Sequence, residues 1–246
     1  MHQATRASGI RSTGAVLNKR IPRRLLQLYG GLTLYGASMA LMVRAGLGLD
    51  PWDVFHQGVA EHTGLSIGMV VNITGALVLL LWIPLRERPG LGTLSNVLLI
   101  GTTMDLTLRL LPEVTALGAR VPLMLGAVVL NGAATGLYIS ARFGPGPRDG
   151  LMTALHRITG RSIRLMRTAL EVTVLVSGVL LGGTAGVGTV VYAVAIGPLA
   201  QFFLRIFAIR ETESGMDFEE RRGAGILRLR SRRMSRYPGP SCADAG

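Results

Sequence analysis

Two aspartates in similar surroundings are the first residues of this sequence that could do chemistry. Asp53 stands in GLGLDPWDV and Asp149 in RFGPGPRDG, each two residues after a proline and five after a glycine. A proline followed by an aspartate is typical of a helix start, where a carboxylate can bond free backbone N–H groups. The same end of a helix can face a polar or anionic solute. Two interpretations stay open: the aspartates cap helices, or they handle a solute or a proton.

Both aspartates belong to an internal duplication. Residues 46–67 return as residues 142–163, displaced by 96 positions, and 23 of the 80 aligned pairs from Gly30 to Arg109 are identical. Several identities are glycine, proline or aspartate, which shared apolar composition does not produce. A copied unit should be recognised before any other structural prediction. We therefore expect the shared glycines and prolines to shape the same structure twice.

Three further ionisable residues stand inside apolar stretches. Glu171 has Gly75 as its counterpart, so it is not an inherited cap, and Asp105 lies opposite Gln201. An ionisable group inside a membrane span is costly and is by default a functional candidate. Arg167 precedes Glu171 by four residues on one helix face, so an intrahelical ion pair is the alternative. The hypothetical substrate-binding residues are Gly48, Pro51, Asp53, Gly144, Pro147, Asp149, Glu171, Arg167 and Asp105.

The elements that must position these residues are membrane-spanning helices. The chain is 49% hydrophobic and only 16% charged, with a mean hydropathy of +0.43, which indicates a membrane protein. Six stretches are long enough to cross a hydrocarbon core of roughly 30 Å. These stretches are residues 25–47, 66–85, 91–111, 121–140, 162–181 and 187–209.

Charge gives the predicted orientation. The net charge of +12 comes from a basic segment at residues 1–24, two basic connections and an Arg-rich tail at residues 210–246. The positive-inside rule places these segments in the cytoplasm, and we expect both terminal segments to lack regular structure. Basic residues in these places, without interleaved aromatic residues, argue against nucleic acid as a partner.

Three spans per copy make the two copies, residues 25–111 and 119–209, enter the membrane from opposite sides. Such halves are related by a pseudo-two-fold axis in the membrane plane. The predicted fold is all-α: a polytopic membrane helix bundle of six transmembrane helices, arranged as two inverted 3+3 repeats. Each repeat has a short helix after its first span, either amphipathic on the membrane surface or re-entrant.

Motifs for catalysis or cofactor binding are missing from the sequence. It contains no nucleophile elbow, no zinc-binding HExxH, no phosphate loop and no dinucleotide signature. Cys242 is the single cysteine, and the histidines have no metal-ligand spacing. We expect no enzyme activity, no cofactor and no metal.

A resemblance to the YczE-like family of bacterial integral membrane proteins is carried by six motifs: GLGLDPWDV, HTGLSIG, RPGLGTLSN, GPGPRDGLM, TGRSIRLMRTALE and GVGT. It covers residue 25 to about residue 207. The resemblance implies a bacterial inner-membrane setting, and no binding residue is transferred from it.

Two functions follow from these features. The first is a small-solute transporter or channel subunit with its site between the repeats, in contact with membrane lipids and the solute. The alternative is a non-transporting membrane partner or scaffold that assists another enzyme or transporter, as a homo-oligomer or through its basic tail. The depth of Asp53 and Asp149 discriminates between them: a cavity favours transport, whereas a lipid-facing position favours the partner.

Overall fold

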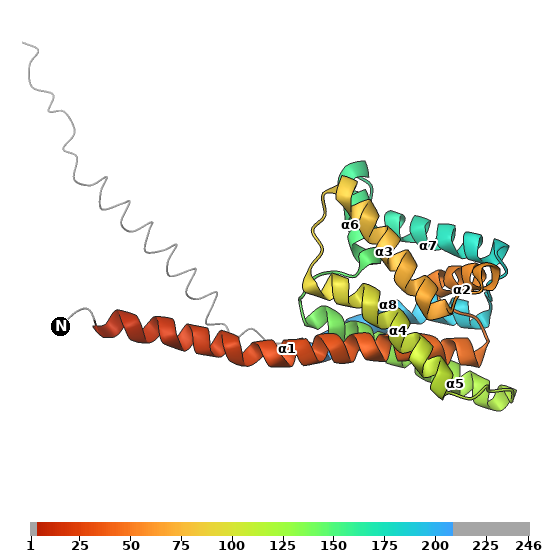
Figure 1. Ribbon diagram of the computed structural model, residues 1–246, viewed down its shortest axis with the longest axis horizontal. Helices are drawn as coiled ribbons and strands as arrows, with labels where there is room; N and C mark the ends of the chain where they lie inside the picture. Colours follow the sequence, from red (N-terminus) through yellow and green to blue (C-terminus); the bar gives the residue numbers. More distant parts are fainter. Residues whose placement is uncertain (1–3, 209–246) are drawn as a thin grey trace, which may run out of the picture. The chain divides into compact units, whose positions relative to one another are not determined.

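The computed structural model describes residues 4–208, and its regular secondary structure there is entirely helical (Figure 1). The order of a long helix, a short helix and two more long helices occurs twice. The helices are α1 (Ala4–Ala45), α2 (Pro51–Thr63), α3 (Ile67–Leu85), α4 (Leu91–Leu110), α5 (Leu117–Ser140), α6 (Pro147–Thr159), α7 (Ile163–Leu180) and α8 (Val187–Phe207). The Arg-rich tail predicted at residues 210–246 lies outside the described residues.

Five helices are long and apolar enough to cross a membrane: the Ile21–Ala45 part of α1, and α3, α4, α5 and α8. They correspond to five of the six predicted spans. The sixth prediction, residues 162–181, corresponds to α7, whose three charged residues keep it out of this set.

The N-terminal segment differs from the prediction that it lacks regular structure, because α1 already begins at Ala4. A helix propagates more easily than it nucleates, and the apolar span provides the nucleus.

The short helices α2 and α6 begin and end at equivalent residues. Each begins at a proline, Pro51 or Pro147, and each stops at a glycine in the left-handed conformation, Gly64 at φ 71° and Gly160 at φ 65°. The helix that follows is capped in both halves by a serine side chain. The predicted starts and stops are confirmed, and they depend on the fixed φ of proline and the permissive φ of glycine.

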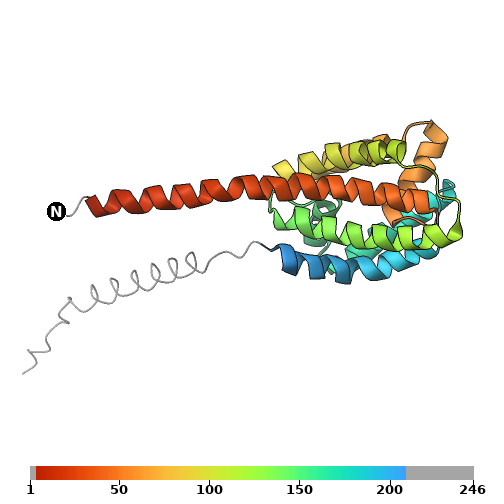
Figure 2. The same ribbon diagram turned by 90° about the horizontal axis from the view of Figure 1, so that it is seen from below.

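The first long helices of the two halves, α1 and α5, pack against each other, with α4 on the other side of α1 (Figure 2). Arg24 donates to the Ala141 carbonyl at 2.9 Å, and Asn131 donates to Ser38 at 2.8 Å. Because residue numbers rise along α1 as they fall along α5, the two helices run antiparallel. The Tyr192 hydroxyl adds α8 by donating to Asn131 at 3.1 Å. Asn131 is therefore an interhelical hydrogen-bonding residue that joins α1, α5 and α8.

Each short helix packs on a long helix of the opposite half, α2 on α7 and α6 on α3. A Cβ added to Gly178 of α7 would lie 2.5 Å from the backbone nitrogen of Phe55 in α2. In the equivalent contact, the Trp82 indole of α3 donates to the Pro147 carbonyl at 3.1 Å. The two halves therefore interleave.

The turns before the short helices are held by equivalent hydrogen bonds from the opposite half. The Gly92 N–H donates to the Phe143 carbonyl at 2.9 Å, and the Gly188 N–H donates to the Leu47 carbonyl at 2.8 Å. Gly188 is the counterpart of Gly92, and Phe143 is the counterpart of Leu47. Each half thus fixes the loop that precedes the short helix of the other half.

Candidate functional site

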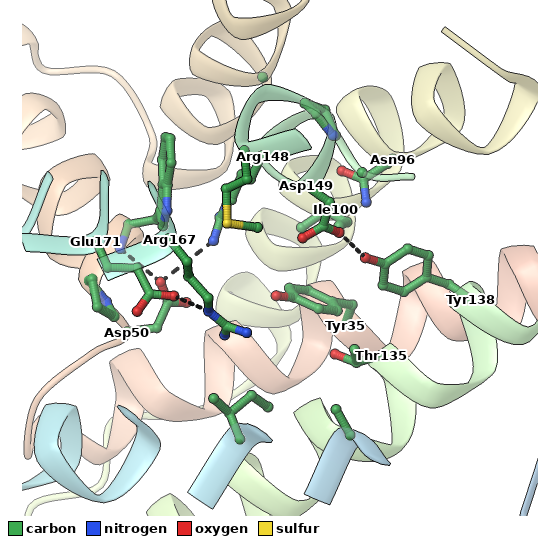
Figure 3. Close-up of a pocket in the computed structure, with 18 of the residues that line it drawn as sticks. Tyr35, Asp50, Asn96, Ile100, Thr135, Tyr138, Arg148, Asp149, Arg167 and Glu171 are labelled. Carbon is green, nitrogen blue, oxygen red and sulfur yellow. Dashed lines mark hydrogen bonds and ion pairs between the residues drawn. The ribbon is translucent and has the colours of Figure 1, made fainter. Parts of the chain in front are cut away.

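A cavity of about 340 Å³ lies between the two halves, and all eight helices contribute to its lining (Figure 3). This volume is in the range of about 300–1,000 Å³ that small-molecule sites occupy. Both short helices begin at the cavity wall. Equivalent positions of the two halves line it in pairs: Pro51 and Pro147, Trp52 and Arg148, Val71 and Arg167, Gly75 and Glu171, Asn96 and Tyr192, Ile100 and Ile196.

Asp50, in the cavity wall, is the N-cap of α2. Its Oδ1 accepts the backbone N–H groups of Trp52 at 2.9 Å and Asp53 at 3.1 Å. Only 1% of the residue is exposed, and its Oδ2 has no hydrogen-bond partner among the described residues. The capping role considered for Asp53 therefore belongs to Asp50, which keeps one carboxylate oxygen unused.

Arg148, in the first turn of α6, reaches the start of α2. Its Nη1 lies 3.7 Å from Asp50 Oδ1, and its guanidinium lies over the Trp52 ring, 4.8 Å from the ring centre. A guanidinium stacks favourably on an indole face. Its side chain lines the cavity and is 28% exposed. Within the described part of the chain, no acceptor lies within hydrogen-bond distance of this guanidinium.

Asp53 lies behind Asp50 and does not line the cavity. It is 0% exposed; its Oδ1 lies 3.1 Å from His56 Nδ1, and its Oδ2 has no described partner. Burial, together with the Asp53 carboxylate, raises the pKa of Asp50 to about 7, against the opposing charge of Arg148. Burial raises the pKa of Asp53 to about 6 and lowers that of His56 to about 3. The start of α2 therefore holds two carboxyl groups that bind protons readily, beside a neutral imidazole.

Asp149 and the α7 ion pair complete the polar lining. Asp149 accepts the Tyr138 hydroxyl at 3.1 Å, and Figure 3 shows both residues beside Asn96. On α7, Arg167 Nε donates to Glu171 Oε1 at 2.9 Å, and both residues line the cavity. The intrahelical pair expected from their spacing is thus present, and it faces the space where a solute would lie.

Three further predicted site residues, besides Asp53, lie away from the cavity. Asp105 accepts the Gly68 N–H at 2.8 Å, so it joins α3 to α4. Gly48 and Gly144 have φ of +121° and +120° and form the turns before the short helices. A Cβ on Gly48 would lie 2.8 Å from the backbone nitrogen of Gly186, so the turn packs tightly against the other half.

The cavity continues into a crevice between α7 and α8. Arg167, Glu171 and Tyr192 line both spaces, and Arg164 and Thr168 line the crevice. In the described chain, α7 and α8 are not among the helix pairs that pack extensively. The crevice therefore gives the cavity a way out through the second half.

The equivalent helices of the first half, α3 and α4, are packed together. Asn72 donates to Thr102 at 3.2 Å and accepts the Gly101 N–H at 3.1 Å. A Cβ on Gly68 would lie 2.0 Å from the Gly101 carbonyl oxygen, so the two backbones are in close contact. Gly68 has Arg164 as its counterpart, and no such approach is available to an arginine. The cavity is closed between α3 and α4 and open between α7 and α8.

Sequence comparison of the two halves did not select the central residues of this cavity. Asp50, Trp52 and His56 line it, but their counterparts are Gly146, Arg148 and Met152. A search for identities discards such positions. These residues differ between the halves, and that difference could have identified them. Asp50 stands where the other half has Gly146, and Arg148 stands where it has Trp52.

The described residues are entirely helical and include several apolar helices long enough to cross a membrane, so the chain is a multi-pass membrane protein. The chain belongs to the family of unknown function DUF6198, whose model matches residues 22–205. This confirms the resemblance to the YczE-like family.

Three relatives are similar to the chain. The Bacillus subtilis "Uncharacterized membrane protein YczE" is 36% identical over 180 residues, which cover 72% of this chain and 83% of the relative. A Haemophilus influenzae protein is 41% identical over 177 residues, covering 72% of this chain and 81% of the relative. The Bacillus subtilis protein YyaS is 27% identical over 183 residues, covering 72% and 91%. No solved structure matches the chain.

Proposed function

We propose that this protein transports a small solute across the bacterial inner membrane, through the cavity between two inverted repeats. The observation that carries the proposal is the contact of Arg148 with Asp50, two charged residues from opposite halves, in the wall of that cavity. Charged groups in a membrane interior are expensive and are typically retained on solute or ion pathways.

The inverted arrangement is supported by three relationships. The equivalent helices α1 and α5 are antiparallel, and the hydrogen bonds from Gly92 and Gly188 are reciprocal between the halves. Trp52 and Arg148, which are counterparts, touch each other. Reciprocal contacts and self-contact of one position are what a two-fold axis generates. A transporter site at such an axis is a recurring plan.

The sixth crossing in this proposal is α7. Its Arg167 and Glu171 line the cavity and Arg164 lines the crevice, which supports a polar face of α7 turned toward these spaces. An amphipathic helix of 18 residues can cross a bilayer when its polar face lines an aqueous space. With α7 included, each half has three spans and the halves run in opposite directions.

The proposed orientation has both termini in the cytoplasm. The connection between α5 and α7 and the turn between α3 and α4 carry arginines, whereas the turn between α7 and α8 has no charge. Short basic loops stay in the cytoplasm. The crevice beside Arg164, at the start of α7, then opens toward the cytoplasm.

The position of Asp149 supports transport over the partner hypothesis. Asp149 lines the cavity, whereas Asp53 is fully buried behind Asp50 and does not line it. Neither lies on an outer, lipid-facing surface, which was the expected position for a membrane partner.

The test is uptake by purified protein in liposomes, screened with radiolabelled small anions, cations and zwitterions. We expect one class of solute to enter, with Arg148→Gln and Asp149→Asn reducing the initial rate at least tenfold. Arg157→Gln is the matched control, since Arg157 lies on the same helix and pairs with Glu87 at 2.8 Å outside the cavity. Folded protein that moves none of these solutes would contradict transport.

A further inference from the structure

The donors of Arg148 are largely unused. Its one ion pair within the described chain, with Asp50 at 3.7 Å, is too long for a hydrogen bond, and its planar face is occupied by Trp52. The N–H edge of a guanidinium matches the two oxygens of a carboxylate or a similar oxyanion. An arginine held flat on a ring, with its edge facing a cavity, is pre-organised to bind such an anion.

Two carboxylate oxygens beside this arginine accept no hydrogen bond from a donor group in residues 4–208, and the two acids are close enough to share a proton. Asp50 Oδ2 and Asp53 Oδ2 are buried without a hydrogen-bond partner among the residues described, and the two side chains occupy one helical turn. An unpartnered buried carboxylate oxygen is costly when ionised and is relieved by a proton.

We propose that the cavity binds a small oxyanion on Arg148 and a proton on Asp50 in one coupled step, so that the protein is a proton–anion symporter. The proposal rests on the transport function above. When Asp50 is ionised, its carboxylate attracts Arg148 and competes with the solute anion. When Asp50 takes up a proton, this competition ends and Arg148 is available. Loading one proton and one anion adds no net charge to a buried site, which avoids the cost of burying a single ion.

Titratable groups surround Asp50 on several elements. The titratable groups that face it are Asp53 and His56 on α2, Arg148 and Asp149 on α6, Arg167 and Glu171 on α7, Tyr35 on α1, Tyr138 on α5 and Tyr192 on α8. Glu171 is paired with Arg167, and Asp149 accepts from Tyr138. Arg148 is therefore the cation of this set whose ion pair is with Asp50, and the Asp53 carboxylate adds to the negative charge beside it. The raised pKa of Asp50, about 7, puts its titration in the range where a cell maintains a proton gradient.

Binding is tested on the full chain in detergent, with nitrate and sulfate as probes at constant ionic strength, because both oxyanions keep their charge between pH 5.5 and 8.5. The readout is the rise in the thermal unfolding midpoint with anion concentration. A second readout is Trp52 fluorescence in Trp82→Phe, which leaves Trp52 as the single tryptophan. We expect half-saturation at least tenfold lower in anion at pH 5.5 than at pH 8.5. Equal half-saturation at both pH values would overturn the coupling.

Two variants separate the roles of the pair. Asp50→Asn imitates the protonated side chain, so we expect tight binding at both pH values. Arg148→Gln should bind neither anion, whereas the control Arg157→Gln should behave as the unmodified chain does. The coupling is wrong if Asp50→Asn keeps the full pH dependence, and the anion site is wrong if Arg148→Gln still binds.

Transport separates this inference from the proposed function. In proteoliposomes with an alkaline interior, the proton gradient should accumulate the anion at least tenfold, and Asp50→Asn should abolish accumulation while exchange continues. If neither the proton gradient nor Asp50→Asn changes uptake, the coupling is wrong, while the proposed transport function still stands. Coupled binding without uptake would support the site and contradict transport.

Discussion

The guanidinium of Arg148 lies 4.8 Å from the centre of the Trp52 ring, and these two residues occupy the same position in the two halves of the duplicated sequence. Contact between equivalent residues occurs where an axis relates two halves. An unchanged duplication would bring two identical side chains together at that point. Here they are a cation and an aromatic ring, so the halves have diverged into a complementary pair at their centre.

The coupling between Arg148 and Asp50 can be measured with a double-mutant cycle. Arg148→Gln leaves the buried Asp50 carboxylate without a cation, so we expect the free energy of unfolding at pH 8 to fall by about 1–3 kcal/mol. Asp50→Asn added to Arg148→Gln should recover part of this loss. Chemical denaturation in detergent gives the four values. Effects that add within about 0.5 kcal/mol would mean that the two residues do not interact.

Stability should depend on pH through Asp50. Folding raises its pKa from 3.8 to about 7, so between these values the folded state holds a proton that the unfolded state releases. Its contribution is complete below pH 3.8 and is lost as the pH rises toward 7. His56 acts in the opposite sense below pH 6.5, because burial lowers its pKa to about 3.

The difference between the unmodified chain and Asp50→Asn reports the titration of Asp50 together with its coupling to Asp53, since His56 is common to both. Between pH 4.5 and 8, we expect the free energy of unfolding of Asp50→Asn to rise relative to that of the unmodified chain by on the order of 1–3 kcal/mol. Thermal unfolding across this range is the measurement. A constant difference between the two proteins would show that Asp50 titrates normally.

The glycines that start α4 and α8 should be equally intolerant of a side chain. A Cβ on Gly90 would lie 2.3 Å from the Phe143 carbonyl oxygen, and a Cβ on Gly186 would lie 2.5 Å from the Leu47 carbonyl oxygen. Each alanine substitution should lower the free energy of unfolding by about 1–3 kcal/mol. Gly126→Ala is the control, since a Cβ there meets nothing within 4 Å. If all three variants unfold alike, the two halves do not hold each other's loops in this way.

Helix boundaries were predictable because they depend on local chemistry. The proline that starts each short helix and the glycine that stops it act through their own backbone preferences, and both appear in the sequence at one spacing. The prediction for Asp53 failed in its detail for a related reason. Asp50 and Asp53 both suit a helix start, and only the three-dimensional turn decides that Asp50 bonds the free N–H groups.

The cavity could not be derived in the same way, because its residues meet only after the halves interleave. The Tyr138 hydroxyl of α5 donates to Asp149 of α6. Arg148 pairs with Asp50, which lies 98 positions earlier in the sequence. Asp105 was a candidate because it is an ionisable residue in a span. Its carboxylate instead accepts a backbone N–H at the start of α3, and it does not line the cavity. An ionisable residue in a span is a candidate site residue, but its hydrogen-bond partner in the folded structure shows whether its role is structural.

The open crevice predicts unequal access to two equivalent positions. Thr168 is exposed and lines the α7–α8 crevice, whereas its counterpart Asn72 is hydrogen-bonded across the closed α3–α4 contact. In a chain with Cys242→Ser, Thr168→Cys should react with a small thiol reagent at least tenfold faster than Asn72→Cys. Mass spectrometry of timed samples gives both rates. Equal rates would mean that both sides are open or both closed.

The inverted relation of the halves is tested most directly by the sidedness of Thr63 and Thr159, two exposed counterparts at the ends of α2 and α6. Each is changed to cysteine in a chain with Cys242→Ser and labelled with a membrane-impermeant thiol reagent in sealed vesicles of known orientation. An inverted arrangement predicts that Thr63→Cys reacts only from the periplasmic side and Thr159→Cys only from the cytoplasmic side. Labelling of both from one side would contradict it.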